Sequence, residues 1–458
     1  MTGAPLQAEG SLVMLGAVDL ELADAPARED RTAPVSRHIL FLQGPLCPLY
    51  ARMGALMRGA GHRVSRINFC PGDWLHWRSP DALSYRGQPE AFRHFIDDYL
   101  RQNAVTDLVL HGDQRIYHKA AIAAAAPLGI QIAVTELGYL RPGYLTLERD
   151  GLSTLSRFPD DPEAIRALAA EVPEADLEPI YPGSFALEAI PDMIYNLFNV
   201  FAGFTYPHYQ RHTIYHPLVE YPAHGLRLLG KGRRNAAVAS AQALLFAGNA
   251  PFFVLPLQLE GDFQLRAHSP YASFAEVIET VIASFAAHAP QASRLVLKSH
   301  PLDAGFERWP ERTAAIADRH GVRDRVLFFD GGTLGPLFQR AAGVVTLNST
   351  AGLEAMQAGC PVKTLVPAHF DIRGLTHAGP LDGFWTAPQR PDPELLDDYI
   401  RAIAAHIQVR GSIHNREGLE AAAGNMTRRI LDRGLNQGAA HVTPPPRLAR
   451  ARALGVPL

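Results

Sequence analysis

Side chains suited to binding an anion follow a short apolar run near residue 347. The run ends in Asn-Ser-Thr-Ala-Gly and passes directly into Leu-Glu-Ala-Met-Gln, which is typical of a buried strand, a tight turn and the first turns of a helix. The free N–H groups and positive dipole end of such a helix favour an anion, and the hydroxyls of Ser349 and Thr350 add short donors. Asn348 opens the turn, Gly352 allows close approach, and Glu354 lies where a carboxylate reaches a ribose hydroxyl. Two interpretations fit: a phosphate or nucleotide cradle, or an ordinary capped strand–turn–helix corner.

A second strand end favours the cradle. Residues 294–301 form another apolar run that ends in a cation, a hydroxyl and an imidazole, followed by proline. The residues at this end are Lys298, Ser299, His300 and Pro301. Open parallel sheets bind ligands at the carboxyl ends of their strands, so two polar strand ends in one domain indicate one shared site.

Polar residues also follow every predicted strand in the first half of the chain. They are Gln43, Asn68 with Asp73, Asp113 with Arg115, and Glu136 with Arg141. Each has a structural explanation on its own, such as a helix cap for Asp113 or a surface ion pair for Arg115. Strand ends of one sheet face the same crevice, however, and carboxylates beside guanidinium groups suit chemistry on an anionic substrate.

Two series of alternating strands and helices position these residues. The first series has apolar runs at 38–42, 64–69, 107–110 and 131–134. The second has runs at 251–258, 294–298 and 326–329, then the run before residue 348. This order is that of doubly wound parallel sheets with right-handed crossovers, so we expect an α/β fold with two Rossmann-like domains. Neither half has a glycine-rich dinucleotide fingerprint, which argues against NAD or FAD, and there is no Gly-Lys-Ser/Thr phosphate loop.

Composition divides the chain into six parts. Ala, Glu, Asp and Pro dominate the start, a stretch without strand alternation follows residue 162, and prolines with alternating Arg and Ala mark the end. We predict a disordered arm at 1–36, an acceptor domain at 37–162, a helical connector at 163–245, a nucleotide-binding domain at 246–395, C-terminal helices at 396–435 and a flexible tail at 436–458.

The connector is rich in aromatic residues, which allow two interpretations. They are Phe198, Phe201, Phe204, Tyr206, Tyr209 and Tyr215. They form either an interdomain core or a surface patch for lipid or a partner enzyme. The basic run at 231–234 is either a solvated loop or a contact with lipid headgroups.

Composition and charge exclude several classes of protein. The 458 residues are 47% hydrophobic and 19% charged with a formal net charge of −3, which is typical of a soluble globular protein and gives no case for a nucleic-acid partner. The three cysteines are unrelated in spacing, so we expect neither a disulfide framework nor a zinc site, and a reducing, cytoplasmic compartment. The start lacks a signal-peptide pattern and no run approaches about 20 apolar residues, so any membrane contact is expected to be peripheral.

Several short motifs occur in a fixed order between residues 38 and 390. They are Leu-Gln-Gly-Pro at 42–45, Arg-Ile-Asn-Phe at 66–69 with Gly72 and Asp73, Gly-Asp-Gln-Arg at 112–115 with His118, Gly-Tyr-Leu-Arg-Pro at 138–142, Leu257 and Gln258 with Asp262, Gln264 and His268, Lys298 with His300 and Pro301, and Asn-Ser-Thr-Ala-Gly at 348–352. On these motifs the chain resembles the capsule polysaccharide biosynthesis proteins of Gram-negative bacteria, the KpsS/LipB type.

The resemblance implies a retaining glycosyltransferase with two Rossmann-like domains of the GT-B kind. Its donor would be CMP-Kdo, where Kdo is 3-deoxy-D-manno-octulosonic acid, and its acceptor a lipid of the (lyso)phosphatidylglycerol type at the base of the capsule chain. The enzyme would lie in the cytoplasm, peripheral on the inner face of the inner membrane, with other capsule biosynthesis and export proteins as candidate partners. Because a CMP-sugar has one phosphate, hydroxyls, a helix N-terminus and a cation suffice to hold it, so neither a metal nor a cofactor is expected.

The resemblance also assigns residues to the site. For the donor they are Gln258, Lys298, His300, Pro301, Asn348, Ser349, Thr350, Gly352 and Glu354. For the acceptor and the sugar they are Gln43, Gly44, Asn68, Asp73, Arg115, His118, Arg141, Asp262, Gln264 and His268. The catalytic candidates are Glu136, Asp113 and His300.

Retention requires a carboxylate nucleophile, or a stabiliser of an oxocarbenium-like state, opposite the leaving CMP. Related two-domain Kdo transferases carry the nucleophile in an acidic–acidic–Gly–aromatic motif, whereas this chain has Glu136, Leu137, Gly138 and Tyr139. Leucine thus occupies the second acidic position. Either Glu136 takes the role, or Asp113 does, or the reaction proceeds without a covalent adduct, while His300 or Lys298 neutralises the departing phosphate.

Two other functions fit the same sequence. One is a different nucleotide-sugar enzyme of the GT-B-like shape, such as a UDP-sugar transferase or epimerase, since fold does not dictate chemistry. The other is a non-catalytic adaptor of capsule assembly and export, for which the leucine at position 137 is the motivation. Such an adaptor would bind CMP without turnover.

Overall fold

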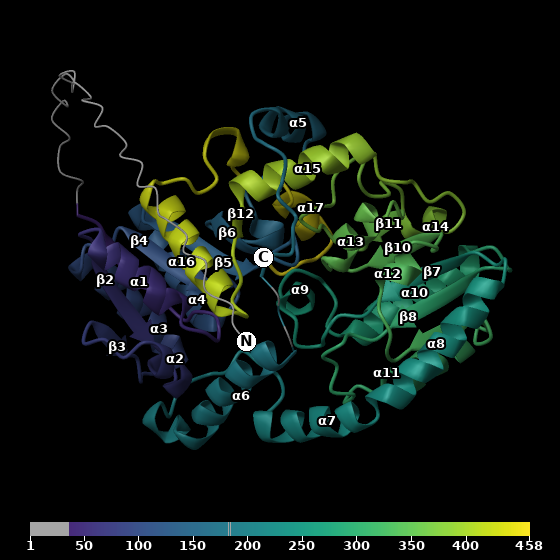
Figure 1. The fold of residues 1–458 in the computed structure, drawn as a ribbon, viewed down its shortest axis with the longest axis horizontal. Coiled ribbons are helices and arrows are strands. Elements are labelled where there is room, and N and C mark those ends of the chain that lie inside the picture. The colour runs from purple at the N-terminus through teal and green to yellow at the C-terminus, as the bar shows by residue number, and fades with distance from the viewer. Residues whose placement is uncertain (1–35, 182, 184) are drawn as a thin grey trace, which may run out of the picture. The chain divides into compact units, whose positions relative to one another are not determined.

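Two β-sheets organise the chain between Arg37 and Leu458 (Figure 1). The structure is a computed structural model and describes residues 36–181, 183 and 185–458. The arm predicted at 1–36 therefore lies, apart from Ser36, outside the described residues.

The first sheet has seven strands. They are β1 (His38–Phe41), β2 (Arg63–Asn68), β3 (Ala82–Ser84), β4 (Asp107–His111), β5 (Gln131–Leu137), β6 (Tyr144–Arg149) and β12 (Gln408–Arg410). Their order is β12-β6-β5-β4-β1-β2-β3, and β1 to β5 run parallel whereas β6 and β12 are antiparallel to their neighbours. The strand order reverses between β1 and β4, so the carboxyl ends of these two strands form a topological switch point.

Alternation along β1 shows why this strand is central. Ile39 and Phe41 join one apolar cluster, and Leu40 and Leu42 join another. Successive side chains of a strand point to opposite faces, so both faces of the sheet are buried. The covering helices are α1 (Leu49–Gly59) and α16 (Arg416–Leu431) on one face, and α3 (Phe92–Gln102) and α4 (Ile116–Ala125) on the other.

The second sheet has five strands, all parallel. They are β7 (Phe252–Pro256), β8 (Arg294–Lys298), β9 (Val326–Phe329), β10 (Gly343–Thr346) and β11 (Val362–Thr364), in the order β11-β10-β7-β8-β9. Strand β7 repeats the alternation of β1, because Phe252 and Val254 face one cluster and Phe253 and Leu255 the other. The switch point here lies between β7 and β10.

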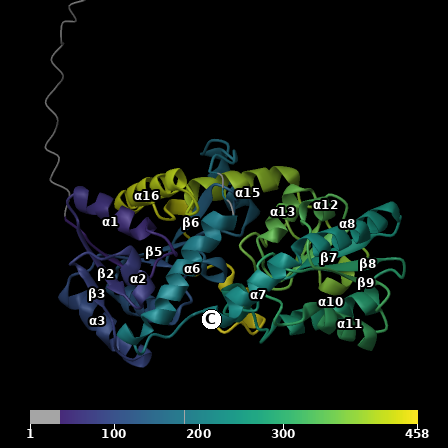
Figure 2. The ribbon, with the colours of Figure 1, turned by 60° about the horizontal axis from the view of Figure 1, so that its bottom comes forward.

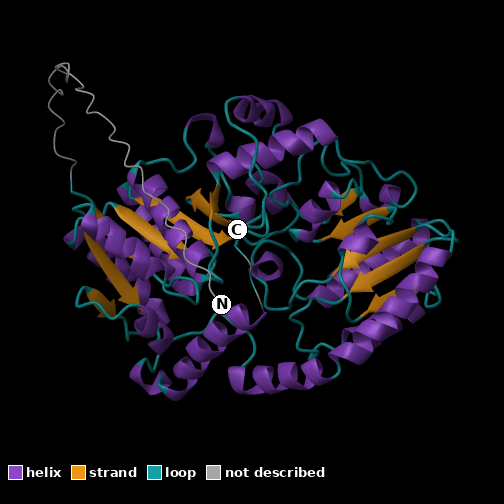
Figure 3. Ribbon diagram, viewed as in Figure 1, coloured by secondary structure: helices purple, strands orange, loops and turns teal. Residues whose placement is uncertain are grey.

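Helices flank both sheets, as Figure 3 shows. Around the second sheet they are α10 (Phe274–His288), α11 (Trp309–Arg319), α12 (Gly335–Phe338), α13 (Ala351–Gln357) and α14 (Leu381–Phe384). Short helices α2 (Pro71–His76) and α9 (Phe263–Arg266) follow β2 and β7. The expected fold class, an α/β protein with two doubly wound Rossmann-like sheets, is confirmed.

The stretch expected to connect the two halves is helical. It contains α5 (Pro162–Ala170), α6 (Phe185–Phe201), α7 (Pro217–Leu229) and α8 (Lys231–Ala247). After the second sheet, α15 (Pro393–His406) packs against α5, and the chain then returns to the first half. There β12 pairs with β6, and α16 packs against α1.

The tail differs from its prediction as a flexible segment over 436–458. Residues from Leu448 to Ala453 form α17, and the preceding Arg447 is fully buried. Its guanidinium donates to the backbone carbonyls of Phe158, Pro159, Ala368 and His369, at 2.7 to 3.2 Å. The tail is therefore held by hydrogen bonds to carbonyls from both halves, a contact that its proline-rich composition does not reveal.

Candidate functional site

Hydrogen bonds join the second switch point to the first half of the chain. After β7, Gln258 Nε2 donates to Asn348 Oδ1 at 3.3 Å, and Asn348 Nδ2 donates to the carbonyl of Gln264 at 3.0 Å. Gln264 lies in α9, and its Oε1 accepts from Ser153 Oγ at 2.7 Å. Because Ser153 follows β6, helix α9 links the carboxyl ends of β7 and β10 to the first half (Figure 1).

Asp113 lies at the same junction, directly after β4. Its Oδ2 accepts from the backbone N–H of Leu152 at 2.9 Å, and its Oδ1 is 4.0 Å from His268 Nε2. His268 comes from the second half, and its Nδ1 is 3.1 Å from Thr154 Oγ1. Burial raises the pKa of Asp113 to about 6 and lowers the pKa of His268 to about 4. The structure thus brings two predicted residues together, and the imidazole is neutral at pH 7.

Glu136 lies near the end of β5 with its side chain 42% exposed. Its Oε1 accepts from the N–H of Leu137 at 2.9 Å and is 3.5 Å from His111 Nε2. Burial lowers the pKa of His111 to about 4, although the negative charge of Glu136 opposes this shift. Because His111 is neutral at pH 7, the carboxylate is not paired with an imidazolium and is accessible to a ligand.

Arg141 follows β5 and acts on residues of the second half. Burial raises the pKa of Asp262 and of Glu354 above the usual values. The positive charge of Arg141 opposes this rise in both groups. Burial, Lys298 and Arg141 together lower the pKa of His300 to about 4. These interactions connect the end of β5 with α9, with the end of β8 and with α13. The charge of Arg141 therefore acts on predicted residues of the second half.

His300 is held in a defined tautomer. Its Nδ1 accepts from the backbone N–H of Leu302 at 3.1 Å. A neutral imidazole that accepts at Nδ1 carries its proton on Nε2, which can then donate to a ligand oxygen. Next to it, the buried Lys298 donates from Nζ to the carbonyl of Ser299 at 2.7 Å, and burial lowers the pKa of Lys298. Pro301 follows on the exposed side.

The turn predicted as a cradle is present, and part of it serves the fold. Ser349 Oγ accepts from the N–H of Ala351 at 3.2 Å, a local turn bond that leads into α13. At Gly352 a Cβ atom would lie 2.6 Å from the ring of Phe370, so packing alone requires glycine there. Thr350 is partly exposed at the N-cap position. Binding of a nucleotide by this turn stays a prediction.

Gln43, Asn68 and Asp73 belong to a buried polar network. Gln43 Nε2 donates to Tyr195 OH at 3.0 Å, and Tyr195 OH donates to Asp73 Oδ1 at 2.9 Å. Asn68 Oδ1 accepts from Arg66 Nε at 2.9 Å. Since Tyr195 lies in α6, this network holds the connector against the first sheet, and a contact between these residues and a substrate stays a prediction.

A pocket of about 340 Å³ lies between the first half, the connector and α9. Its lining residues are Gln43, Gln114, Arg115, Ile116, Tyr117, Lys119, Gln210, Arg211, His212, Phe263 and Arg266. Arg115 NH1 also donates to the carbonyl of Gly44 at 3.4 Å, which places this glycine beside the pocket. Burial and Arg115 lower the pKa of His212 well below its usual value, so four Arg and Lys side chains carry the charge. Such a pocket suits an anionic group.

Sequence reasoning found Arg115 and missed the other cations of this pocket. Lys119 could have been found, because it follows Arg115 by one helical turn in α4. Arg211 and Arg266 come from the connector and from α9, and nothing in their spacing indicates that they meet. His118 lies behind the pocket lining, with its Nδ1 2.6 Å from the carbonyl of Gly112 and its pKa well below the usual value because of burial.

Residues 36–181, 183 and 185–458 contain neither a cluster of metal ligands nor a membrane-spanning helix. No group of three or more His, Cys, Asp or Glu side chains in this part is arranged to hold a metal ion. No helix in it is both long and apolar enough to cross a membrane.

Two doubly wound sheets, joined by hydrogen bonds near the carboxyl ends of their strands, define an α/β protein with a candidate site between two Rossmann-like halves. The sequence profile described as capsule polysaccharide biosynthesis protein matches residues 106–414. The chain belongs to this family, as its motifs predicted.

The chain is similar to two curated relatives over most of its length. One is the capsule polysaccharide export protein KpsS of Escherichia coli, 30% identical over 374 residues, which are 81% of this chain and 95% of the relative. The other is the capsule polysaccharide modification protein LipB of Neisseria meningitidis serogroup A, 29% identical over 390 residues, or 83% and 92% of the two chains. Among solved structures, the KpsC beta Kdo 2,7 transferase of Thermosulfurimonas dismutans matches with a TM-score of 0.42 and 15% identity, covering 86% of this chain and 99% of that one.

Proposed function

We propose that this protein is a retaining glycosyltransferase that transfers Kdo from CMP-Kdo to a (lyso)phosphatidylglycerol-type lipid, where the capsule linker starts. The observation that carries the proposal is the hydrogen-bonded junction at Gln264 of α9, which accepts from Ser153, after β6, and from Asn348, after β10. A group transfer needs donor and acceptor at one point, and this link joins the strand ends of both halves.

The donor belongs on the second half. The Nε2–H of His300 offers a hydrogen bond to a phosphate oxygen, and the nearby cation Lys298 offsets negative charge on the leaving CMP. The hydroxyls of Ser349 and Thr350 lie at the end of β10, beside Asn348 at the switch point. One phosphate requires only a few such donors, so we propose that no metal takes part.

Glu136 is the proposed nucleophile or oxocarbenium-stabilising carboxylate. It is exposed, and its neighbour His111 is neutral. As a nucleophile, Glu136 would form a bond to the anomeric carbon while the bond to the CMP oxygen breaks and CMP keeps the electron pair. The acceptor hydroxyl would then displace Glu136 and give up its proton to a base. Asp113, with a pKa of about 6, is the candidate base and is itself held by Leu152.

The basic pocket is the proposed site of the acceptor's phosphate. Arg115, Lys119 and Arg211 supply positive charge, and the pocket lining contains no Asp or Glu to neutralise it. A phosphodiester headgroup carries one negative charge and accepts several hydrogen bonds. An acceptor embedded in a bilayer would place the enzyme at the inner face of the inner membrane, together with other capsule biosynthesis and export proteins.

A non-catalytic adaptor is the second candidate. Leu137, in the position of the second acidic residue, packs against the apolar cluster of α1 and α16. An apolar side chain that packs against the core thus replaces the second carboxylate. An adaptor would bind CMP without releasing a glycosylated lipid, and Glu136→Gln would leave its role in the cell intact.

The experiment is turnover of purified protein with CMP-Kdo, generated in situ, and a short-chain phosphatidylglycerol. The wild type should form product, Glu136→Gln should form none, and the exposed Glu171→Gln should behave as the wild type. Stabilisation by CMP, measured as a rise in Tm, reports the donor site separately. A rise in Tm without product from the wild type would reject the transferase with this acceptor and favour the adaptor. A clear preference for UDP-sugars would assign the chain to a different nucleotide-sugar reaction.

A further inference from the structure

An apolar surface covers one side of helices α6 and α7, which lie next to each other at the front of Figure 2. Its exposed side chains are Leu187, Ile190, Met193, Ile194 and Phe201 of α6, Phe204 of the following 3-10 turn, and Leu218, Val219, Leu226 and Leu229 of α7. We refer to these residues as the α6–α7 face. Phe204 is 82% exposed and Leu229 is 85% exposed, so these are not partly covered core residues.

The face follows the helical period on both helices. On α6, positions 187, 190, 194 and 201 form one stripe, and on α7 positions 218, 222, 226 and 229 form another. A surface helix of a globular protein normally turns its apolar stripe toward the core. Here the stripe is exposed to solvent from Leu187 to Phe201 on α6 and from Leu218 to Leu229 on α7.

Polar side chains of the same helices make the contacts with the rest of the protein. On α6, Asn199 Oδ1 accepts from the N–H of Gly72 at 2.6 Å, and Tyr195 donates to Asp73. On α7, Arg227 pairs with Asp330 of the second half. The amphipathic pattern is therefore inverted on both helices, which needs an apolar environment outside the protein.

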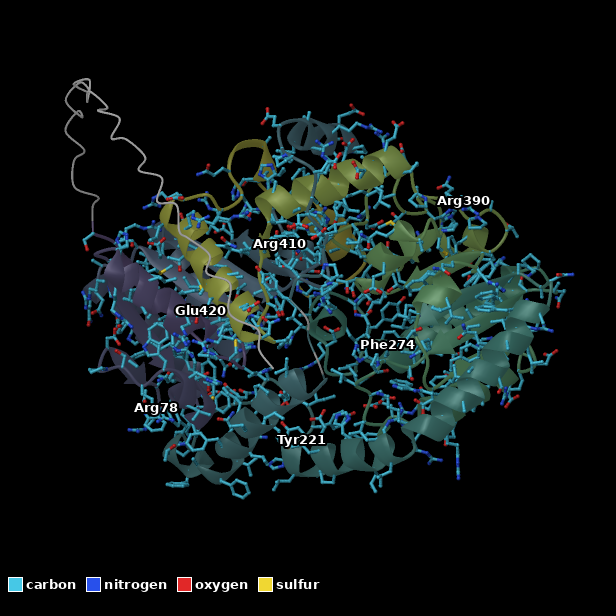
Figure 4. All side chains as sticks on the ribbon, viewed as in Figure 1. Arg78, Tyr221, Phe274, Arg390, Arg410 and Glu420 are labelled. Carbon is cyan, nitrogen blue, oxygen red and sulfur yellow. The ribbon has the colours of Figure 1, made fainter. Side chains whose placement is uncertain are left out.

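Aromatic and basic residues border the face. The ring of Trp74 lies 6.4 Å from the ring of Phe198 of α6, and Arg78 lies 4.7 Å above Trp74. Lys231 and Arg233 begin α8 directly after α7. Figure 4 labels Arg78 and, on α7, Tyr221 along the lower edge of the view.

The charge at this border is positive. Within the described part of the chain, Arg78, Lys231 and Arg233 form no ion pair with a carboxylate. The described carboxylates of the two helices face polar partners: Asp192 accepts from Tyr221 at 2.8 Å, and Glu220 Oε1 lies 3.7 Å from His224 Nε2. Unpaired cations around an apolar centre complement an anionic surface.

We infer that the α6–α7 face rests on an anionic phospholipid bilayer, with both helices parallel to its plane. Helices that lie in the lipid–water interface have apolar stripes bordered by tryptophan and by Arg and Lys, which is the arrangement of Trp74, Arg78 and Lys231 here. Arg211 of the basic pocket lies in the loop between α6 and α7, so a lipid headgroup has a short route to that pocket. The inference deepens the proposed function, which needs a lipid acceptor, but its test needs no turnover.

The test is co-sedimentation with vesicles of phosphatidylglycerol and phosphatidylethanolamine, without nucleotide sugar. The double variant Leu226→Gln/Leu229→Gln should bind the vesicles about tenfold more weakly, because it removes two exposed apolar side chains that would enter the bilayer. The control variant Leu56→Gln/Leu454→Gln changes two half-exposed leucines outside this face, one on α1 and one just after α17, and should bind as the wild type. Replacing Lys231 and Arg233 by Gln should weaken binding at low salt and bring it closer to that for phosphatidylcholine vesicles.

Trp74 gives a second readout. It is 43% exposed, whereas Trp77, Trp309 and Trp385 are buried, so a blue shift of tryptophan emission on adding vesicles reports this border. Equal vesicle binding by the Leu226/Leu229 variant and the wild type, or an unshifted emission, would overturn the inference. So would wild-type self-association without lipid that the same variant abolishes, since a second copy would then cover the face. The Leu226/Leu229 variant should keep its turnover on a water-soluble short-chain acceptor, which separates membrane docking from catalysis. If this variant folds poorly, Ile190→Gln/Ile194→Gln repeats the test.

Discussion

Substitution of Arg447 tests the contact that fixes the C-terminal tail. The buried guanidinium donates from Nε to Ala368, from NH1 to Phe158, and from NH2 to both Pro159 and His369, at 3.1, 2.8, 3.2 and 2.7 Å. All four acceptors are backbone carbonyls. Arg447→Met keeps most of the apolar volume and leaves these carbonyls without their donor.

The magnitude follows from two opposing terms. Each carbonyl left unsatisfied costs about 1 to 3 kcal/mol, so four give roughly 4 to 12 kcal/mol before relaxation. Burial lowers the pKa of the Arg447 guanidinium, which shows that its charge is desolvated in the folded state. Removing this charge therefore recovers several kcal/mol of desolvation free energy. The expected net loss is about 3 kcal/mol, in the range for breaking a buried charged contact. With an unfolding entropy of about 2.1 cal/mol/K per residue, roughly 420 residues give about 0.9 kcal/mol/K, so Tm falls by about 3 °C.

The assay is thermal and urea unfolding of the wild type, Arg447→Met and the matched variant Arg450→Met. Arg450 lies in α17 and makes an exposed ion pair with Asp371 at 2.8 Å, which is worth at most about 1 kcal/mol. Arg447→Lys should also be destabilised, because an ammonium group has no planar fork to reach four carbonyls. Equal stability of Arg447→Met and Arg450→Met would refute the reasoning and restore the flexible tail.

Two further predictions concern pH and the acceptor. Burial raises the pKa of Glu148 from 4.5 to about 7, so the folded state binds this proton more tightly than the unfolded state. The protonated group therefore stabilises the fold fully below pH 4.5, and this contribution is lost as pH rises through about 7. The Tm of Glu148→Gln relative to the wild type should therefore rise between pH 5 and pH 8, and a constant difference would contradict this assignment. In the pocket, Arg115→Gln/Lys119→Gln should raise KM for the anionic acceptor by roughly tenfold or more while KM for CMP-Kdo changes little. An unchanged acceptor KM, or the same change with the exposed Arg93→Gln, would exclude the pocket as the acceptor site.

Buried strands of both sheets could be predicted because their signal is local. The runs around β1, β7 and β8 are continuous apolar segments bounded by polar turns, as expected for strands covered on both faces. Strand β12 could not be found this way, because Gln408–Arg410 has only three residues and gains its partner, β6, from a distant part of the chain. The burial of Arg447 was missed for the same reason, since all its acceptors are far away in sequence.

For the site, the strand ends could be predicted and their partners could not. Topology places the residues at the carboxyl ends of β4, β5, β7, β8 and β10 at one edge of each sheet, which is why the sequence predicts Glu136, Arg141, His300 and Asn348 as site residues. Gln43 and Asp73 obey the same rule, but Tyr195 of α6 occupies their hydrogen-bonding groups. No local pattern predicts where a connector helix will dock, so the sequence could not distinguish an open strand end from a covered one.

NMR of the reaction of CMP-Kdo with short-chain phosphatidylglycerol tests the central claim most directly. The account predicts that the wild type releases one CMP for each lipid glycosylated, that the product keeps the anomeric configuration of the donor, and that Glu136→Gln releases CMP no faster than buffer. A product of inverted configuration would contradict the role of Glu136. CMP binding with no release of CMP from CMP-Kdo, at any concentration of this acceptor, would contradict the transferase itself.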